Sequence, residues 1–333
     1  MGFGKIGQTF SALEIHQIVK EDLRRVEEEI RLESIASVDT VTAITRHLQA
    51  GGGKRLRPTL LLLSCRLFRD PDEMAIRLGA VVEMVHTATL VHDDVIDVAG
   101  TRRGRASTNT VWGNHTSVLA GDWLYMQAFQ MALKERNFRV LDLLISLTQL
   151  MVEGEVLQLE RIGNMSLTEN DYMDLVDRKT ASLFSVCAKL GAIVGHASEE
   201  EENRLGHFAW NLGMAFQLVD DILDFTASES VLGKPVGNDL REGKVTLPLI
   251  YALERGTDVE RAMVETVLKT GDYAAVPFKQ ILDFANSSKG IERARARAQV
   301  FTETAREIIA NFPDSQTQRA LAAVTELITD RDH

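Results

Sequence analysis

The chain of 333 residues has little cysteine, little proline, few aromatic residues and no excess of positive charge. Its two cysteines, Cys65 and Cys187, provide neither a disulfide framework nor a zinc site, and their scarcity suits a reducing cytosol. The six prolines are scattered and no Ser/Gly-rich linker interrupts the sequence. Although this length suggests about two domains, we therefore expect a single domain over residues 1–333.

The formal net charge of −11 argues against nucleic acid as a partner. No apolar run reaches membrane-spanning length, and residues 1–10 lack the basic and apolar regions of a signal peptide. We therefore expect a cytoplasmic location. An acidic protein that binds an anionic substrate needs local cations, which directs attention to metal ligands and to the few basic clusters.

Apolar residues recur at spacings of three and four throughout, whereas strand-like alternation is absent, so the sequence predicts an all-α fold. Two helices are expected within residues 11–48 and several short ones from 244 to 329. The longer helices are expected at 58–68, 72–98, 116–135, 138–161, 168–179, 181–196 and 199–226. Loops are expected at 99–108 and 232–243.

Two aspartate clusters with the same spacing follow apolar helical stretches. The clusters are Asp93, Asp94 and Asp97, and Asp220, Asp221 and Asp224. Residues three and four apart share a helix face, so each cluster is predicted to aim three carboxylates at one spot. A lone cluster could instead cap a neighbouring helix or face solvent. Two of them predict a clamp for Mg²⁺ and a diphosphate, because Mg²⁺ prefers carboxylate and phosphate oxygens.

A basic glycine-rich segment, Gly51-Gly52-Gly53-Lys54-Arg55-Leu56-Arg57-Pro58, precedes the first cluster. Glycine allows close approach of the backbone to a ligand, and proline suits the first turn of a helix, whose N-terminus favours anions. Lys54 and Arg57 are then placed to grip a phosphate. The alternative is a hinge with surface charges. The segment is not a Walker A motif.

Further polar residues surround the two clusters. His86 lies two helical turns before Asp93, Gln217 lies one turn before the second cluster, and Arg102 and Arg103 follow the first. Alone, His86 would be a core histidine and the arginines a solvated loop. Beside a phosphate site, His86 becomes a donor, and the adjacent arginines are placed to hold two different anions.

The segments GGGKRLRP, LVHDDVIDVAGTRRG, FQLVDDILD and LGKPVGNDLREGK together resemble the trans-polyprenyl diphosphate synthases, most strongly over residues 42–249. GDWLYMQAFQMA, EGEVLQLE and KTASLFSVCAKLG are similar to the long-chain branch that makes octaprenyl and related diphosphates. The resemblance implies the all-α isoprenoid synthase fold, with helices around a central cavity and both aspartate clusters at its mouth. It also implies a homodimer.

The resemblance assigns roles to individual residues. It implies that isopentenyl diphosphate is held by Lys54, Arg57, His86 and Arg103. The residues that contact the allylic diphosphate or its leaving pyrophosphate would be Arg102, Lys179, Thr180, Gln217, Lys234 and Lys244. The main Mg²⁺ ligands would be Asp93, Asp97 and Asp220, with Asp94, Asp221 and Asp224 in support.

The implied reaction adds isopentenyl diphosphate to an allylic diphosphate, with farnesyl diphosphate as the expected primer, in successive trans 1′-4 condensations. The expected product is octaprenyl diphosphate for quinone side chains, delivered to the membrane. Small side chains before the first cluster, at Val85, Ala88 and Thr89, would leave the product tunnel open. Phe129 is the candidate floor, although it could be an ordinary core aromatic.

Three other functions remain as alternatives. A shorter-chain synthase would make geranylgeranyl or farnesyl diphosphate. A class I terpene cyclase would not need the GGGKRLRP segment. A non-catalytic synthase subunit would typically lose aspartates or the basic loop, and this chain retains both.

Overall fold

The structure, a computed structural model, describes residues 11–227 and 236–329. Lys234, predicted to contact the allylic diphosphate, lies outside the described residues. The first half contains α1 (Ala12–Glu33), α2 (Asp39–Ala50), α3 (Leu56–Arg66), α4 (Glu73–Ile96), β1 (Thr101–Arg102), β2 (Arg105–Ala106), α5 (Thr108–Trp112), α6 (Asn114–Lys134) and α7 (Phe138–Glu160). The second half contains α8 (Glu169–Val176), the π-helical turn η1 (Asp177–Ala181), α9 (Ser182–Val194), α10 (Glu199–Thr226), α12 (Asn238–Arg241), α13 (Leu247–Leu253), α14 (Asp258–Thr270), α15 (Phe278–Ser287), α16 (Gly290–Ala310) and α17 (Gln316–Thr329).

Local sequence signals explain where the two aspartate-bearing helices begin. The Asp72 side chain accepts hydrogen bonds from the backbone N–H groups of Met74 and Ala75 at the start of α4. Ser198 and Glu201 form a reciprocal capping box at the start of α10. Such caps satisfy amide groups that the first turn of a helix leaves unpaired. The caps therefore help to fix where the last turns of α4 and α10, which carry the aspartates, lie.

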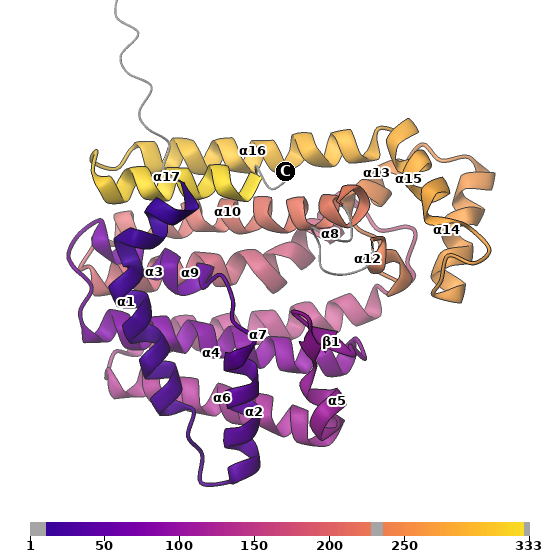
Figure 1. The fold of residues 1–333 in the computed structure, drawn as a ribbon. Helices are drawn as coiled ribbons and strands as arrows, with labels where there is room; N and C mark the ends of the chain where they lie inside the picture. The colour runs from indigo at the N-terminus through magenta and orange to yellow at the C-terminus, as the bar shows by residue number, and fades with distance from the viewer. Residues whose placement is uncertain (1–10, 228–235, 330–333) are drawn as a thin grey trace, which may run out of the picture.

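Long helices pack side by side to form the body of the molecule (Figure 1). α4 packs against α6, α10 lies between α9 and α16, and α3 packs against α9. Buried apolar side chains form two clusters, and α10 contributes to both: Leu205 to Leu212 belong to the first and Met214 to Phe225 to the second. The predicted all-α architecture is confirmed.

Several details differ from the sequence prediction. The expected loop at 99–108 contains a hairpin of two two-residue strands, in which Thr101 pairs with Ala106 and Arg102 with Arg105. Not all of the C-terminal helices are short, since α16 has 21 residues. By length and composition α4 could also cross a membrane, contrary to the sequence reading, but 67% of its apolar window is buried in the protein. The apolar character of α4 is therefore explained by its burial in the protein core.

Candidate active site

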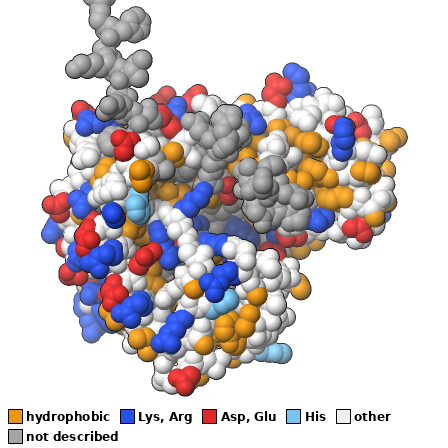
Figure 2. Space-filling model, in the orientation of Figure 1, with side chains coloured by type: hydrophobic (Ala, Val, Ile, Leu, Met, Phe, Trp, Pro, Cys, Tyr) orange, Lys and Arg blue, Asp and Glu red, His pale blue; other side chains and the backbone are white. Residues whose placement is uncertain are grey.

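A cavity of about 1030 Å³ lies between the C-terminal halves of α4 and α10. Its polar lining includes Lys54, Arg57, His86, Asp93, Arg102, Arg103, Glu155, Lys179, Thr180, Gln217 and Asp220. Lys and Arg side chains gather around a hollow near the middle of the face seen in Figure 2. The apolar lining includes Tyr125, Met151, Leu183 and Phe216. One chamber thus joins a charged region to an apolar one.

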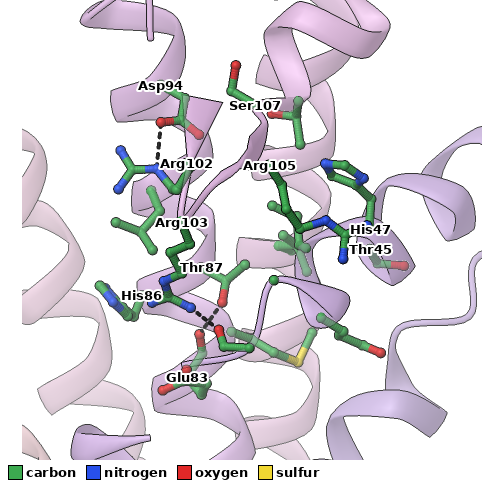
Figure 3. A pocket seen from close by; sticks show the side chains of 18 of the residues that line it. Thr45, His47, Glu83, His86, Thr87, Asp94, Arg102, Arg103, Arg105 and Ser107 are labelled. Carbon is green, nitrogen blue, oxygen red and sulfur yellow. Dashed lines mark hydrogen bonds and ion pairs between the residues drawn. The ribbon is translucent and has the colours of Figure 1, made fainter. Parts of the chain in front are cut away.

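The first aspartate cluster occupies the last turn of α4 and its C-cap. Asp93 lines the cavity. Asp94 is buried and its carboxylate accepts a hydrogen bond from Arg102 Nε at 2.6 Å. Asp97 Oδ1 lies 3.1 Å from Lys244 Nζ. Asp94 is thus turned toward Arg102 of the hairpin (Figure 3), whereas Asp93 lines the cavity.

The three carboxylates of the second cluster also point in different directions. Asp220 lines the cavity. Buried Asp221 accepts hydrogen bonds from the Tyr172 hydroxyl at 2.6 Å and from Gln217 Nε2 at 2.8 Å. Asp224 accepts from the backbone N–H groups of residues 238 and 239, both at 3.2 Å.

The prediction that each cluster aims three carboxylates at one spot is therefore corrected. Adjacent positions differ by about 100° around a helix, and neighbouring donors draw the second aspartate of each pair away. No group of three or more His, Cys, Asp or Glu side chains within residues 11–227 and 236–329 is arranged around a single metal position. The cavity instead brings together one aspartate from each helix, Asp93 and Asp220.

The aspartates are held in surroundings that disfavour their charge. Burial, together with the nearby Glu155 and Asp97 carboxylates, raises the pKa of Asp93 to about 6 against the opposing charge of Lys179. Burial also raises the pKa of Asp221 to about 6, with Asp220 and Asp224 adding to the effect. Crowded carboxylates are relieved by a bound cation. The oxygen donors and their crowding fit a hard divalent ion such as Mg²⁺.

The basic segment between α2 and α3 forms one wall of the cavity. Lys54 and Arg57 both line it. The Arg57 guanidinium lies over the Phe184 ring at 5.5 Å, and its buried Nε has no hydrogen-bond partner among the described residues. Arg57 is thus oriented by an aromatic face, and its buried Nε is left unsatisfied. The alternative of a mobile surface hinge does not fit a side chain packed in this way.

His86 lies beside Arg103 of the hairpin (Figure 3) and lines the same cavity as Lys54 and Arg57. Burial lowers its pKa well below the usual value, and the charges of Arg57, Arg103 and Arg102 lower it further. The imidazole is therefore neutral at neutral pH. It can donate one hydrogen bond to an anion without adding a charge.

The two adjacent arginines of the hairpin point to different partners. Arg102 is paired with Asp94, whereas Arg103 Nη1 donates to the Gly52 carbonyl oxygen. Gly53 makes room for this contact, because a Cβ there would lie 2.7 Å from Arg103 Nη1. Arg102 thus belongs with the first cluster and Arg103 with the basic segment; that the two serve different anions stays a prediction.

Lys179 and Thr180 are presented by the π-helical turn η1. Lys179 Nζ lies 2.6 Å from a Glu155 carboxylate oxygen and 3.2 Å from Gln158 Oε1. Thr180 Oγ1 donates to Gln217 Oε1 at 2.9 Å. Lys179, Thr180 and Gln217 all line the cavity on the side of Asp220.

Several residues of this region had no assigned role from the sequence. Glu155 and Gln158 lie in the segment EGEVLQLE, and both hold Lys179. Tyr172 binds Asp221, and buried Glu83 binds Arg55 Nη1 at 2.7 Å. The only sequence signal for Glu83 was its position one turn before His86 on an otherwise apolar helix face.

The predicted chain-length residues occupy different surroundings. Thr89 lines the cavity. Val85 and Ala88 are buried in the core around α4, and Phe129 is partly buried against the same core. Tyr125, one helical turn before Phe129, is the aromatic residue of α6 that lines the cavity. The chain-length role of Phe129 stays a prediction.

Comparison with known proteins places this site in a family. The polyprenyl synthetase family model matches residues 38–284. The chain belongs to the polyprenyl synthetase family. It is an enzyme, a trans-prenyltransferase, and its fold is the all-α isoprenoid synthase fold.

Full-length relatives agree with this assignment. The chain is 35% identical to octaprenyl diphosphate synthase of Escherichia coli (strain K12) over 318 residues, which are 96% of this chain and 98% of the relative. A decaprenyl diphosphate synthase from Rhodobacter capsulatus superposes with a TM-score of 0.92 at 35% identity, covering 97% of this chain and 100% of that one. These relatives favour the long-chain branch for the present synthetase.

A third relative bears on the metal. A polyprenyl synthase from Caulobacter crescentus, solved in complex with calcium and isoprenyl diphosphate, superposes with a TM-score of 0.92 at 32% identity. The match covers 98% of this chain and 99% of that one. The family uses a divalent metal, and the carboxylates at the mouth of this cavity are ligands suited to one.

Proposed function

We propose that this synthetase condenses isopentenyl diphosphate with an allylic diphosphate, with farnesyl diphosphate as primer, in successive trans 1′-4 additions that require Mg²⁺. The observation that carries the proposal is the single cavity. It joins Asp93 of α4 and Asp220 of α10 to a basic wall and continues into an apolar region. A diphosphate needs the charged part and a growing hydrocarbon needs the apolar part.

The basic wall is proposed to bind isopentenyl diphosphate. Lys54 supplies a point charge, and Arg57 supplies a fork whose Nε has no protein partner. Neutral His86 donates a hydrogen bond, and Arg103 closes the site from the hairpin. None of these side chains is paired with an aspartate of the two clusters in the interactions described above.

The opposite wall is proposed to hold the allylic diphosphate. Mg²⁺ bound to Asp93, Asp97 and Asp220, with Asp94, Asp221 and Asp224 in support, would neutralise the departing pyrophosphate. Arg102, Lys179 and Lys244 line the same part of the protein and would stabilise the same developing charge. Thr180 and Gln217 form a hydrogen-bonded pair beside it. We assign Lys234 to this group from its motif alone.

Water must be kept from the allylic cation, or the cation would be hydrolysed. The apolar lining formed by Tyr125, Met151, Leu183 and Phe216 suits that requirement. It also gives the product a place to extend. We propose a long-chain product, octaprenyl diphosphate, that serves quinone side chains; geranylgeranyl or farnesyl diphosphate would require this apolar region to be closed within a few isoprene units.

We infer a homodimer formed through α6 and α7. Large apolar side chains on these helices are exposed in the single chain: Val118, Leu119, Met126, Leu133, Phe138, Ile145, Val152, Val156 and Leu159. Val118, Val152, Val156 and Leu159 also line the cavity. Exposed apolar surface of this extent is typical of a protein interface, and a second copy would cover the outer side of the cavity wall.

We further propose a single domain over residues 1–333 and a cytoplasmic enzyme that delivers its product to a membrane. The single domain is supported by α10, which contributes to both core clusters. The cytoplasmic location is supported by Cys65 and Cys187, which are buried and free.

Product analysis tests the proposed reaction. The purified enzyme is incubated with Mg²⁺, isopentenyl diphosphate and farnesyl diphosphate, and the dephosphorylated products are resolved by length. Products of about eight isoprene units are expected. Products that stop at four isoprene units would support the proposed condensation but reject the long-chain product. A folded, metal-supplied enzyme that elongates nothing would reject the condensation itself and favour the cyclase or the non-catalytic subunit.

A further inference from the structure

A buried carboxylate, Glu83, lines the cavity beside the basic wall, together with Arg55. It belongs to α4, one turn before His86, and it is 5% exposed. Figure 3 shows Glu83, His86 and Arg103 grouped beneath the hairpin. A negative charge beside an anion-binding site opposes anion binding unless a cationic side chain neutralises it. The position of Glu83 therefore requires a different explanation from that of the substrate-binding residues.

Glu83 forms an ion pair with Arg55. Glu83 Oε1 lies 2.7 Å from Arg55 Nη1, and the two side chains are 7% and 15% exposed. Arg55 makes a second ion pair with Glu27 of α1, at 3.2 Å. Through Arg55, the basic segment is tied to both α1 and α4.

The backbone at Arg55 needs such support. Arg55 has φ of 48°, in the left-handed region, and it is the N-cap of α3 without a side-chain capping bond. Residues other than glycine avoid this conformation unless their surroundings hold it. The two ion pairs hold it here. The turn at Arg55 in turn sets the directions in which Lys54 and Arg57 leave the backbone.

Glu83 also balances the charges of the arginines that face the cavity. Burial lowers the pKa of Arg57 and of Arg103, and in both cases the Glu83 carboxylate opposes that shift. A buried charge is costly unless it is paired. Arg55 and Arg57 therefore differ: Arg55 is paired with Glu83, whereas the Arg57 guanidinium lies over the Phe184 ring in the cavity wall.

We propose that Glu83, acting through Arg55, is a positioning residue for the isopentenyl diphosphate site: it fixes residues 51–57 so that Lys54 and Arg57 can hold the diphosphate. The inference rests on the proposed function and adds a residue that would determine specificity through Arg55, because a carboxylate itself repels a diphosphate. It predicts that loss of Glu83 weakens binding of one substrate and not of the other.

Three variants test the proposal. Glu83→Gln removes the charge and keeps the shape. Arg55→Gly removes the same ion pair but relieves the left-handed backbone, so it guards against a general failure to fold. Asp22→Asn is the control, because Asp22 of α1 forms an ion pair of similar burial with Arg66 of α3, at 2.6 Å, and neither residue lines the cavity.

Steady-state kinetics gives the first measurement. Glu83→Gln and Arg55→Gly are each expected to raise the KM for isopentenyl diphosphate at least about tenfold, a loss of roughly 1.4 kcal/mol of binding. The KM for farnesyl diphosphate and kcat are expected to change by less than about threefold. Asp22→Asn should leave both KM values unchanged. An equal rise in both KM values, or no rise, would overturn the proposal.

Hydrogen exchange gives a second measurement that does not depend on turnover. The amides of residues 51–57 are expected to exchange faster in Glu83→Gln and Arg55→Gly than in the unmodified enzyme, while Asp22→Asn leaves them unchanged. Unchanged exchange in both variants would reject the positioning role even if the enzyme were inactive. Inactivity of the unmodified enzyme, with the expected exchange pattern, would instead reject the proposed function and retain the structural role of Glu83.

Discussion

Lys244 Nζ lies 3.1 Å from Asp97 Oδ1, which joins the loop before α13 to the end of α4 across 147 residues of sequence. Lys244 also contacts Glu242 at 2.7 Å. Burial disfavours the charge of Lys244, but the two carboxylates outweigh it and raise the pKa. Lys244 therefore stays protonated and lies beside the first aspartate cluster.

Replacing this charge should slow the chemical step. Lys244→Ala is expected to lower kcat about 10²- to 10³-fold, the usual cost of removing one group that stabilises developing charge. Lys244→Arg should recover part of the rate. Lys269→Ala, which removes an exposed lysine paired with Glu265, serves as the control. A kcat for Lys244→Ala equal to that of the control would contradict the assignment.

Gly53 is required for the approach of Arg103 to the basic segment. A Cβ at Gly53 would lie 2.7 Å from Arg103 Nη1. Gly53→Ala is therefore expected to displace Arg103 and raise the KM for isopentenyl diphosphate about tenfold. At Gly100, nothing lies within 4 Å of an added Cβ, so Gly100→Ala is the control. Equal KM values for the two variants would show that Arg103 adapts without cost.

Acid should weaken metal binding. Burial raises the folded-state pKa of Asp93 to about 6 from an ordinary value of 3.8. Between these values the folded, metal-free protein holds more protons than the unfolded chain, so this group's contribution to stability falls as pH rises. Metal must displace the proton below pH 6.

The measurement is the Mg²⁺-dependent rise in Tm, in the presence of inorganic pyrophosphate, between pH 5 and 8. The apparent affinity for Mg²⁺ is expected to fall by up to about tenfold per pH unit below pH 6. In Asp93→Asn this dependence should be reduced along with the affinity. A pH-independent affinity in the unmodified enzyme would contradict the prediction.

Aromatic residues on α6 should limit product length. Tyr125 lines the cavity and Phe129 lies one turn deeper against the core. Tyr125→Ala and Phe129→Ala are each expected to lengthen the products, measured by chromatography after dephosphorylation. Val259→Ala removes an exposed apolar side chain of α14, outside the cavity and the inferred dimer interface, and is the control. An unchanged distribution for Phe129→Ala would assign that residue to ordinary core packing.

Release of a long product should limit turnover. Each buried CH₂ contributes about 0.8 kcal/mol, so each added isoprene unit raises product affinity. Detergent or vesicles are therefore expected to raise the steady-state rate while leaving the first turnover unchanged. A steady-state rate that does not respond would favour a shorter or readily released product.

Much of the site could be anticipated from residue spacing. Apolar residues three and four apart predicted the helices, and both aspartate clusters, the basic segment and the arginine pair were found around one cavity. The directions of single side chains could not be anticipated. Spacing places Asp94 and Asp221 near their neighbours, but Arg102 and Tyr172 draw each of them away.

The sequence by itself determined the all-α fold and the chemical character of the site, because helix periodicity and carboxylate spacing are local properties. Only the tertiary structure decided which charged side chains form ion pairs within the protein and which do not. Arg55 and Arg57 are two residues apart and both line the cavity, yet Arg55 is paired with Glu83 whereas the Arg57 guanidinium lies over the Phe184 ring. That difference arises because Glu83 is 28 residues from Arg55 in sequence and meets it only when α3 packs on α4.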